Sequence, residues 1–234
     1  MAISIFGVMI VLLLLGFPMM IPLIAGALIG FVTLFGGVGQ LDTMVQQILG
    51  GIQPASLIAV PMFIFAADIM TRGQSANRLI DLVMAFVGHL KGGLAVSTAT
   101  ACTLFGAVSG STQATVVAVG GPLRPRMLKA GYKDSFVLAL IVNSSDIAFL
   151  IPPSIGMIIY GVVSGTSISE LFIAGNGPGL LILVLFSIYS YIYAVRNNVP
   201  TEPKATWAER GRAVQRALWP LGFPVIIVGG MKRA

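Results

Sequence analysis

Long apolar stretches constrain this chain more than any other feature. They lie at residues 3–37, 54–70, 94–121, 135–162, 171–195 and 217–230. A membrane-spanning helix needs about 20 predominantly apolar residues, and four of these stretches exceed that length. Only 9% of the residues are charged and 56% are hydrophobic, whereas a soluble domain carries about a quarter charged residues. The sequence therefore predicts an all-α integral membrane protein, a multi-span helical bundle whose solvent is the lipid bilayer.

Between these stretches, the basic residues are confined to three of the connections. These residues are Arg72, Arg78 and Lys91; Arg124, Arg126, Lys129 and Lys133; and Arg196, Lys204, Arg210, Arg212 and Arg216. The connections at 38–53 and 163–170 contain neither Lys nor Arg. Because Lys and Arg accumulate in cytoplasmic loops, the first three connections are predicted to be cytoplasmic and the last two external. The same distribution explains the basic pI, so no nucleic-acid partner is expected.

The stretch 94–121 has basic residues on both flanks, Lys91 and Arg124. A single crossing would put these flanks on opposite sides of the membrane, but the charge distribution puts both in the cytoplasm. The middle of the stretch reads SGSTQ, from Ser109 to Gln113. Non-helical backbone at membrane depth survives only when it packs in protein or lines an aqueous cavity. We therefore predict a re-entrant helical hairpin over 94–121 with its tip at Ser109–Gln113.

The stretch 135–162 is too long for one straight crossing. Its 28 residues would span about 42 Å as a helix, whereas the hydrocarbon core is about 30 Å thick. Its middle reads NSSDIAFLIPPS, with Asn143 and Asp146 followed by Pro152 and Pro153. Proline removes a backbone donor and disfavours helix at the residue before it. The sequence therefore predicts a discontinuous helix over 135–162.

Three further segments are interpreted from their patterns. Residues 77–93 alternate apolar and polar side chains at helical spacing, and residues 206–219 are basic with a Trp near each end. Both patterns are typical of helices in the headgroup plane; a short span over 77–93 stays an alternative. Residues 3–37 exceed one span, and Gly16 to Pro18 is the point where the chain would turn between two spans or kink within one. The N-terminus lacks a basic region and a cleavage site, so it is predicted to be a retained span.

The two predicted breaks are rich in oxygen atoms. Ser109, Ser111, Thr112, Gln113 and Asn143 offer hydroxyl or amide oxygens, which suit hard cations such as Na⁺. Helix N-termini at such breaks attract anions, and freed carbonyls coordinate cations. Small residues in membrane helices also serve close packing, and an acid such as Asp146 also caps helices, so these plainer interpretations stay open.

Two motifs resemble a known family. The segment GAVSGSTQATVVAVGGPLRPRM followed by NSSDIAFLIPPSIGMIIYG is similar to the large membrane subunit of tripartite ATP-independent periplasmic (TRAP) transporters. The resemblance runs from GFPMMIPLIAG to GFPVIIVGG. It implies a Na⁺-coupled elevator transporter of the ion-transporter superfamily in the bacterial inner membrane. Its substrate would be an organic anion, such as a C4-dicarboxylate or a sialic acid. Its implied partners are a small four-helix membrane subunit and a periplasmic substrate-binding protein.

The resemblance also implies site residues. The hairpin tip and the discontinuous helix would enclose a Na⁺ site beside the substrate cavity. The expected Na⁺ ligands are Ser109, Ser111, Asn143, Ser144 and Asp146. The expected substrate contacts are Ser109, Gly110, Ser111, Thr112, Gln113, Pro152, Pro153 and Ser154.

The resemblance implies a division into mobile and static parts as well. The expected segments are scaffold spans at 1–73, an arm helix at 74–93, a transport part at 94–162, a scaffold span at 163–203, a second arm helix at 204–218, and the start of a second repeat at 219–234. The tetrapeptide LGFP at 15–18 recurs at 221–224, which supports a repeat. Family members are nearly twice this length, so the chain is expected to be the N-terminal half of an inverted-repeat transporter, unable to transport alone.

Two other function classes were weighed against transport. One is a structural membrane subunit that only assembles with partners. The other is an intramembrane hydrolase using Ser109 or the pair Asp68 and Asp146. A serine nucleophile needs a nearby base, and the single histidine, His89, lies in a predicted interfacial helix. Asp68 is predicted at the membrane edge, away from Asp146, so we expect a transporter rather than an enzyme, with no catalytic residues.

Overall fold

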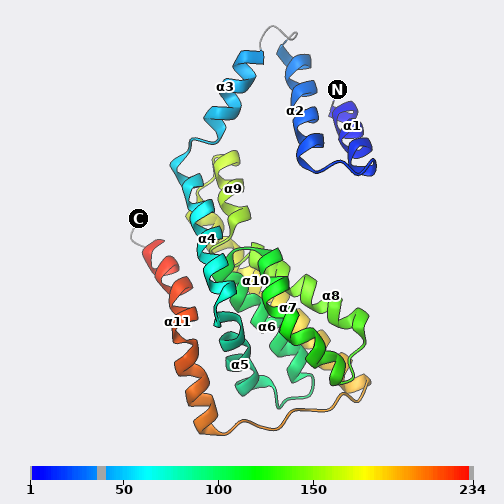
Figure 1. Cartoon of the computed structure of the whole chain (residues 1–234), viewed down its shortest axis with the longest axis vertical. Coiled ribbons are helices and arrows are strands. Elements are labelled where there is room, and N and C mark those ends of the chain that lie inside the picture. Colours follow the sequence, from blue (N-terminus) through cyan, green and yellow to red (C-terminus); the bar gives the residue numbers. More distant parts are fainter. Residues whose placement is uncertain (1, 36–40, 232–234) are drawn as a thin grey trace. The chain divides into compact units, whose positions relative to one another are not determined.

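The computed structural model describes residues 2–35 and 41–231, and all regular structure within these ranges is helical (Figure 1). The prediction of an all-α protein is confirmed. The chain divides into two compact units, Met1–Pro54 and Ala55–Ala234. The larger unit contains both predicted breaks and the predicted arm helices.

The smaller unit contains α1 (Ala2–Leu14), α2 (Met20–Phe35) and α3 (Leu41–Gly51). The described part of 3–37 thus forms two helices, which turn at Gly16 (φ 81°). Helix α3 lies in a segment that the sequence analysis treated as a loop. Its apolar residues Met44, Val45 and Ile48 recur at helical spacing, which is the sequence signal for this helix.

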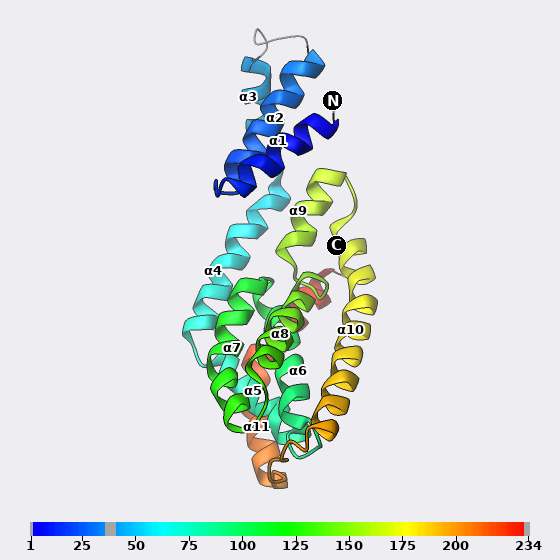
Figure 2. The same ribbon diagram turned by 90° about the vertical axis from the view of Figure 1, so that its right-hand side faces the viewer.

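The larger unit is built around α6. Its elements are η2 (Ala55–Ile58), α4 (Ala59–Arg72), α5 (Ser75–Val87), α6 (Gly93–Ser109), α7 (Thr112–Lys129), α8 (Asp134–Ser145), η3 (Asp146–Phe149), α9 (Ile155–Ser164), α10 (Ile168–Arg196) and α11 (Trp207–Met231). Helix α6 packs against α5, α7, α8 and α10 (Figures 1 and 2), and most of its residues are buried. Its sequence is rich in Gly, Ala, Ser and Thr, which let neighbouring helices approach closely.

One described helix, α10, is by itself long and apolar enough to cross a membrane, and α3 with α4 passes the same test only when the two are counted as one bent span. The apolar helices α1, α2, α6 and α9 are shorter. Large apolar side chains cover the outside of α10, including Leu181, Leu185 and Ile188, each at least half exposed.

The structure extends two predicted segments. Helix α7 continues to Lys129, past the predicted end of the hairpin at 121, although it contains Pro122 and Pro125. Both prolines lie on its exposed face, so their rings do not disturb the packing of the buried face of α7. Helix α11 likewise runs through the predicted boundary between 204–218 and 219–234; residues 232–234 lie outside the described ranges.

The amphipathic helix predicted at 77–93 is present as α5. Its buried residues are Ala76, Leu79, Ile80 and Val83, at the spacing of one helix face. The helix ends at Val87, a full turn before the predicted end. The positions of α5 and α11 relative to the bilayer remain predictions, as do the scaffold and transport assignments of the segments.

Candidate functional site

The predicted hairpin tip is a tight turn between α6 and α7. Helix α6 ends at Ser109, and Gly110 then adopts a left-handed conformation (φ 62°) and donates its N–H to the Gly106 carbonyl at 2.7 Å. Ser111 is extended, and its hydroxyl accepts from the Ala114 N–H at 3.5 Å, which caps α7. A serine cap satisfies one of the free amides at a helix N-terminus. Ser109 thus ends α6, Gly110 forms the turn, and Ser111 caps the start of α7.

A buried hydroxyl network stabilises this turn. The Ser111 carbonyl accepts from the hydroxyls of Thr115 at 2.8 Å and of Ser109 at 3.2 Å. Ser109 and Thr115 are fully buried and lie 3.2 Å apart, oxygen to oxygen. Thr115 was not among the predicted site residues. Its position one helical turn after Ser111 is the sequence signal that would have found it.

The second break separates α8 from α9. Helix α8 ends at Ser145, η3 follows, and the chain then passes through Pro152 and Pro153 before α9 begins. The Pro152–Pro153 peptide bond is cis. Ser154 is extended and fully buried, and its hydroxyl accepts from the Met157 N–H at 3.3 Å, capping α9. The discontinuity predicted within 135–162 is present in the structure.

The two breaks are in direct contact. The Gly110 carbonyl accepts from the Ile155 N–H at 3.4 Å. A Cβ placed on Gly110 would lie 2.7 Å from the Pro153 carbonyl oxygen, and one on Gly106 would lie 2.7 Å from the Ala148 Cβ. The N-terminal ends of α7 and α9 therefore lie side by side, next to the C-terminal end of α6.

The predicted residues divide into two groups in the structure. Those at the tip, from Ser109 to Thr112, come together with Pro153 and Ser154. Gln113 is exposed, and its side-chain oxygen accepts from the Ser111 hydroxyl at 3.2 Å. Pro152 is buried within the second break.

The residues around the end of α8 differ in their exposure and in their hydrogen bonds. Asn143 is exposed, donates to the Ala139 carbonyl at 2.7 Å, and lines a cavity of about 360 Å³ with Phe136 and Tyr189. Asp146 is exposed, and at the end of α8 its backbone N–H donates to the carbonyls of Val142 and Ser144. Ser144 is fully buried, and its hydroxyl has no partner in the described part of the chain.

Two buried hydroxyl groups near the breaks have no hydrogen-bond partner among the described residues. Beside Ser144, the Thr112 hydroxyl at the first residue of α7 also lacks a partner within the described residues. A buried polar group without a hydrogen bond costs about 1–3 kcal/mol, so such atoms point to an unseen ligand or ion. Within residues 2–35 and 41–231 no group of three His, Cys, Asp or Glu side chains is placed to hold a metal ion.

Comparison with known sequences identifies the family of the chain. Residues 6–234 match the family described as the tripartite ATP-independent periplasmic transporter, DctM component. The chain belongs to this TRAP permease family. The predicted resemblance is therefore confirmed, together with the expectation of a membrane-embedded helical transporter component rather than an enzyme.

Three relatives of this TRAP permease illustrate the range of similarity. The ectoine/5-hydroxyectoine TRAP transporter large permease protein of Ruegeria pomeroyi is 81% identical over 99% of this chain and 54% of its own length. The ectoine TRAP transporter large permease protein of Halomonas elongata is 78% identical over 95% of this chain and 52% of its own. The C4-dicarboxylate TRAP transporter large permease protein of Pseudomonas aeruginosa is 42% identical over 75% of this chain and 41% of its own. The chain spans about half the length of the curated relatives it matches.

Proposed function

We propose that this chain supplies one half of the translocation site of a Na⁺-coupled TRAP permease that imports ectoine or a closely similar solute. The observation that carries the proposal is the pairing of two serine-capped helix N-termini, those of α7 and α9, through the bond between the Gly110 carbonyl and the Ile155 N–H. Two adjacent N-termini add their partial positive charges and attract a carboxylate.

The substrate class follows from the relatives and from the charge of the site. The sequence analysis expected an organic anion, such as a C4-dicarboxylate or a sialic acid. The relatives at 81% and 78% identity are named for ectoine, whereas the one at 42% is named for C4-dicarboxylate. Ectoine is a zwitterion with one carboxylate and one amidinium group. No Asp, Glu, Lys or Arg side chain is buried within the described ranges, and a substrate pocket without a buried fixed charge suits a ligand whose two charges cancel.

Na⁺ is proposed to bind as the coupling ion at the C-terminal side of the same breaks. Carbonyl groups at helix C-termini carry partial negative charge and coordinate Na⁺ in discontinuous helices. The unpartnered hydroxyl of Ser144 at the end of α8 is the strongest candidate ligand, because an ion would satisfy it. The oxygens of Ser109 and Ser111 are proposed as further ligands, and Asn143 and Asp146 remain predicted ones.

The rest of the system is proposed from the family. A complete permease would supply the other half of the site, a small membrane subunit would support it, and a periplasmic binding protein would deliver the solute to it. The complex would lie in the bacterial inner membrane. The hairpin α6–α7 would re-enter the membrane, and the transport part would move as an elevator against its scaffold.

The proposal is tested by uptake of labelled ectoine into proteoliposomes that contain the complete permease and its partners. Uptake should require a Na⁺ gradient, and Ser144→Ala should raise the Na⁺ concentration for half-maximal uptake by about tenfold, the loss of about 1.4 kcal/mol in ion binding. The matched control is Ser97→Ala, a second buried hydroxyl without a partner. It lies about 18 Å along α6 from Ser109. Uptake that ignores Na⁺, or equal effects of both variants, would exclude this assignment.

A further inference from the structure

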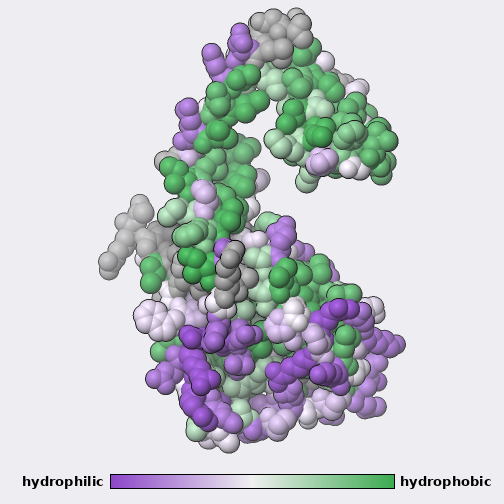
Figure 3. All heavy atoms as spheres, viewed as in Figure 1, coloured by the Kyte–Doolittle hydropathy of each residue, from purple (hydrophilic) through white to green (hydrophobic). Residues whose placement is uncertain are grey.

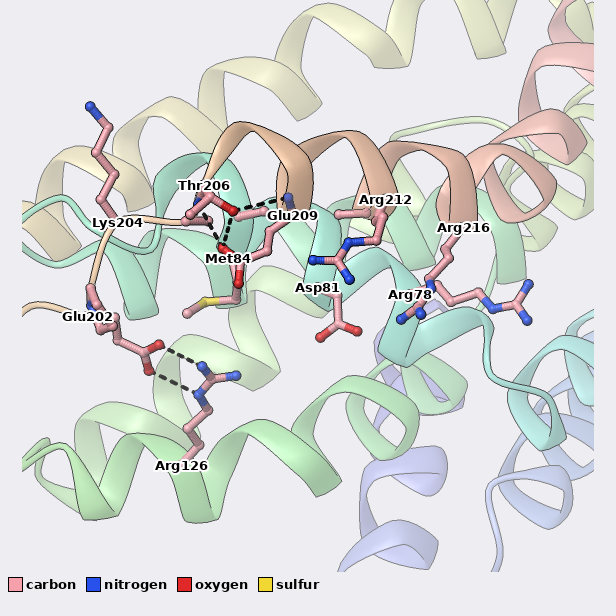
Figure 4. A pocket seen from close by; sticks show the side chains of 14 residues that line it. Arg78, Asp81, Met84, Arg126, Glu202, Lys204, Thr206, Glu209, Arg212 and Arg216 are labelled. Carbon is pink, nitrogen blue, oxygen red and sulfur yellow. Dashed lines mark hydrogen bonds and ion pairs between the residues drawn. The ribbon is translucent and has the colours of Figure 1, made fainter.

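A groove with a surplus of positive charge lies between α5 and α11, outside the proposed translocation site. It has a volume of about 690 Å³ and is lined by one face of α5, by Arg126 of α7, by residues 202–206 and by the first turns of α11. We call it the basic groove (Figure 4). Figure 3 shows hydrophilic residues gathered over the end of the larger unit where α5 and the start of α11 lie.

Two of the three acidic residues in the basic groove are already paired. Glu202 accepts two hydrogen bonds from Arg126, at 2.7 and 3.0 Å. Glu209 accepts from the Thr206 amide at 2.7 Å and hydroxyl at 2.8 Å, which caps α11 and lowers the pKa of Glu209. Both carboxylates are therefore engaged by hydrogen bonds, and of the remaining arginines only Arg212 also lowers the pKa of Glu209, as the smallest of its causes.

Three arginines of the basic groove lack a carboxylate partner. Arg78, Arg212 and Arg216 form no ion pair with any residue in the described ranges, and Asp81 forms none either. Figure 4 shows these side chains extending into the space between α5 and α11. Three guanidinium groups therefore face one carboxylate, and the groove as a whole carries five basic and three acidic side chains. The surplus favours an anionic ligand.

The walls of the groove are held in place without that ligand. Arg210 donates to the Ala85 carbonyl at 3.0 Å, and its guanidinium lies 4.9 Å from the Trp207 ring centre and 5.5 Å from that of Phe86. This contact joins the start of α11 to the end of α5. Arg216 lies about 9 Å further along α11, and Arg78 lies at the opposite end of α5, so the two arginines line the same end of the groove.

The order of residues along α11 predicts that this end of the groove lies beside a membrane surface. Charged residues end at Arg216, Trp219 follows three residues later with 84% of its surface exposed, and the exposed Ile226 lies beyond it. Tryptophan is enriched at the headgroup level, between charged and lipid-facing residues. Because Arg212 precedes Trp219 by seven residues, both lie on one face of α11. The unpaired guanidinium groups thus lie one to two helical turns on the aqueous side of the tryptophan.

We propose that the basic groove binds the phosphate headgroup of an anionic phospholipid, with Arg78 and Arg216 as its main ligands. The planar fork of guanidinium donors matches phosphate oxygens in pairs, and juxtamembrane basic residues attract anionic lipids with about 1 kcal/mol each. A lipid phosphate bound by Arg78 and Arg216 would link α5 to α11.

The test measures lipid binding to the purified protein in detergent by native mass spectrometry, with phosphatidylglycerol and phosphatidylcholine titrated in parallel. The parent should bind phosphatidylglycerol in preference to phosphatidylcholine. Arg78→Gln with Arg216→Gln should weaken phosphatidylglycerol binding by about 25-fold, about fivefold for each guanidinium lost. Arg78→Lys with Arg216→Lys, which keeps both charges, should retain most of the binding and guards against a folding defect.

The matched control removes two charges elsewhere. Lys129→Gln with Arg196→Gln alters exposed residues at the ends of α7 and α10, outside the basic groove, and should leave binding unchanged. Equal weakening by the control pair, or full binding by the glutamine pair, would overturn the proposal. Displacement of the lipid by millimolar inorganic phosphate would instead assign the groove to a soluble anion and would reject the lipid.

Discussion

The turn between α6 and α7 and the break between α8 and α9 interrupt helices in different ways. The first stops α6 with a left-handed glycine and restarts at once, so that α7 folds back on α6. The second passes through a short 3₁₀ element and two prolines before α9 begins. Both restart with an extended serine whose hydroxyl accepts from the amide three residues later. The comparison shows that the start of each new helix is similar and only the stop differs.

The difference between the two stops has a physical reason. A reversal in two residues requires a positive φ, which glycine adopts without a steric penalty. The second break uses prolines, which lack the amide that would continue the helix. The contact between them depends on the glycine as well, because Gly110 leaves room for the Pro153 carbonyl.

The largest expected effect comes from Gly110→Ala. A Cβ there would adopt a disfavoured φ, costing about 1–2 kcal/mol, and would lie 2.7 Å from the Pro153 carbonyl oxygen, adding about 1–3 kcal/mol of overpacking. We expect a loss of about 3 kcal/mol in the free energy of unfolding, measured by denaturant titration in micelles. Gly165→Ala is the control, since Gly165 has φ 70° and no atom near its Cβ position. If both variants lose the same stability, the contact between the breaks contributes nothing.

A middle-sized effect is expected from the two serine caps. Replacing an N-cap serine by alanine costs about 1 kcal/mol. Ser154 is fully buried, whereas Ser111 is partly exposed. Without its cap the Met157 amide is less able to bond to water, so Ser154→Ala should destabilise more than Ser111→Ala. The same unfolding titration measures the difference, with the exposed cap Ser167→Ala as reference. A larger loss for Ser111→Ala would mean that the hairpin, not the break, depends on its cap.

The smallest effect is expected from the ion pair that joins α7 of the hairpin to α8, the helix before the second break. Arg124 of α7 bonds both oxygens of Asp134 at the start of α8, at 2.9 and 3.0 Å, and lowers the pKa of Asp134. Because the pKa of Asp134 is lower in the folded state, the ion pair stabilises the protein at pH values above the ordinary carboxyl pKa near 4. This stabilisation is lost as the pH falls through the lower pKa of the folded state. The parent and Asp134→Asn should therefore differ slightly at pH 7 and converge at pH 2–3. If the difference in unfolding free energy between the two proteins grew as the pH fell, the pKa of Asp134 would be raised and not lowered by folding.

Sequence reasoning located both breaks because their causes are local. Basic residues on both flanks of 94–121 required the chain to return, and Pro152 with Pro153 interrupted a helix that was too long. The serine at each restart is equally local. The family resemblance then added a role for these positions that their chemistry alone left open.

Other features depend on packing between distant segments and were missed. The bond from the Ile155 amide to the Gly110 carbonyl joins residues 45 positions apart, and the basic groove combines α5 with residues more than a hundred positions later. The continuation of α7 through Pro122 depends on which face is exposed. Local composition carries no information on any of these contacts, so the sequence could not reveal them.

The bond between the two breaks has a consequence for how such a site diversifies. Because the bond joins main-chain atoms of Gly110 and Ile155, it requires no particular side chain at position 155 and only the absence of one at position 110. Side chains at the helix starts other than the two capping serines and the buried pair Ser109 and Thr115 are therefore replaceable without breaking this bond. In the proposed translocation site, a new solute preference would then require only new side-chain chemistry on an unchanged backbone.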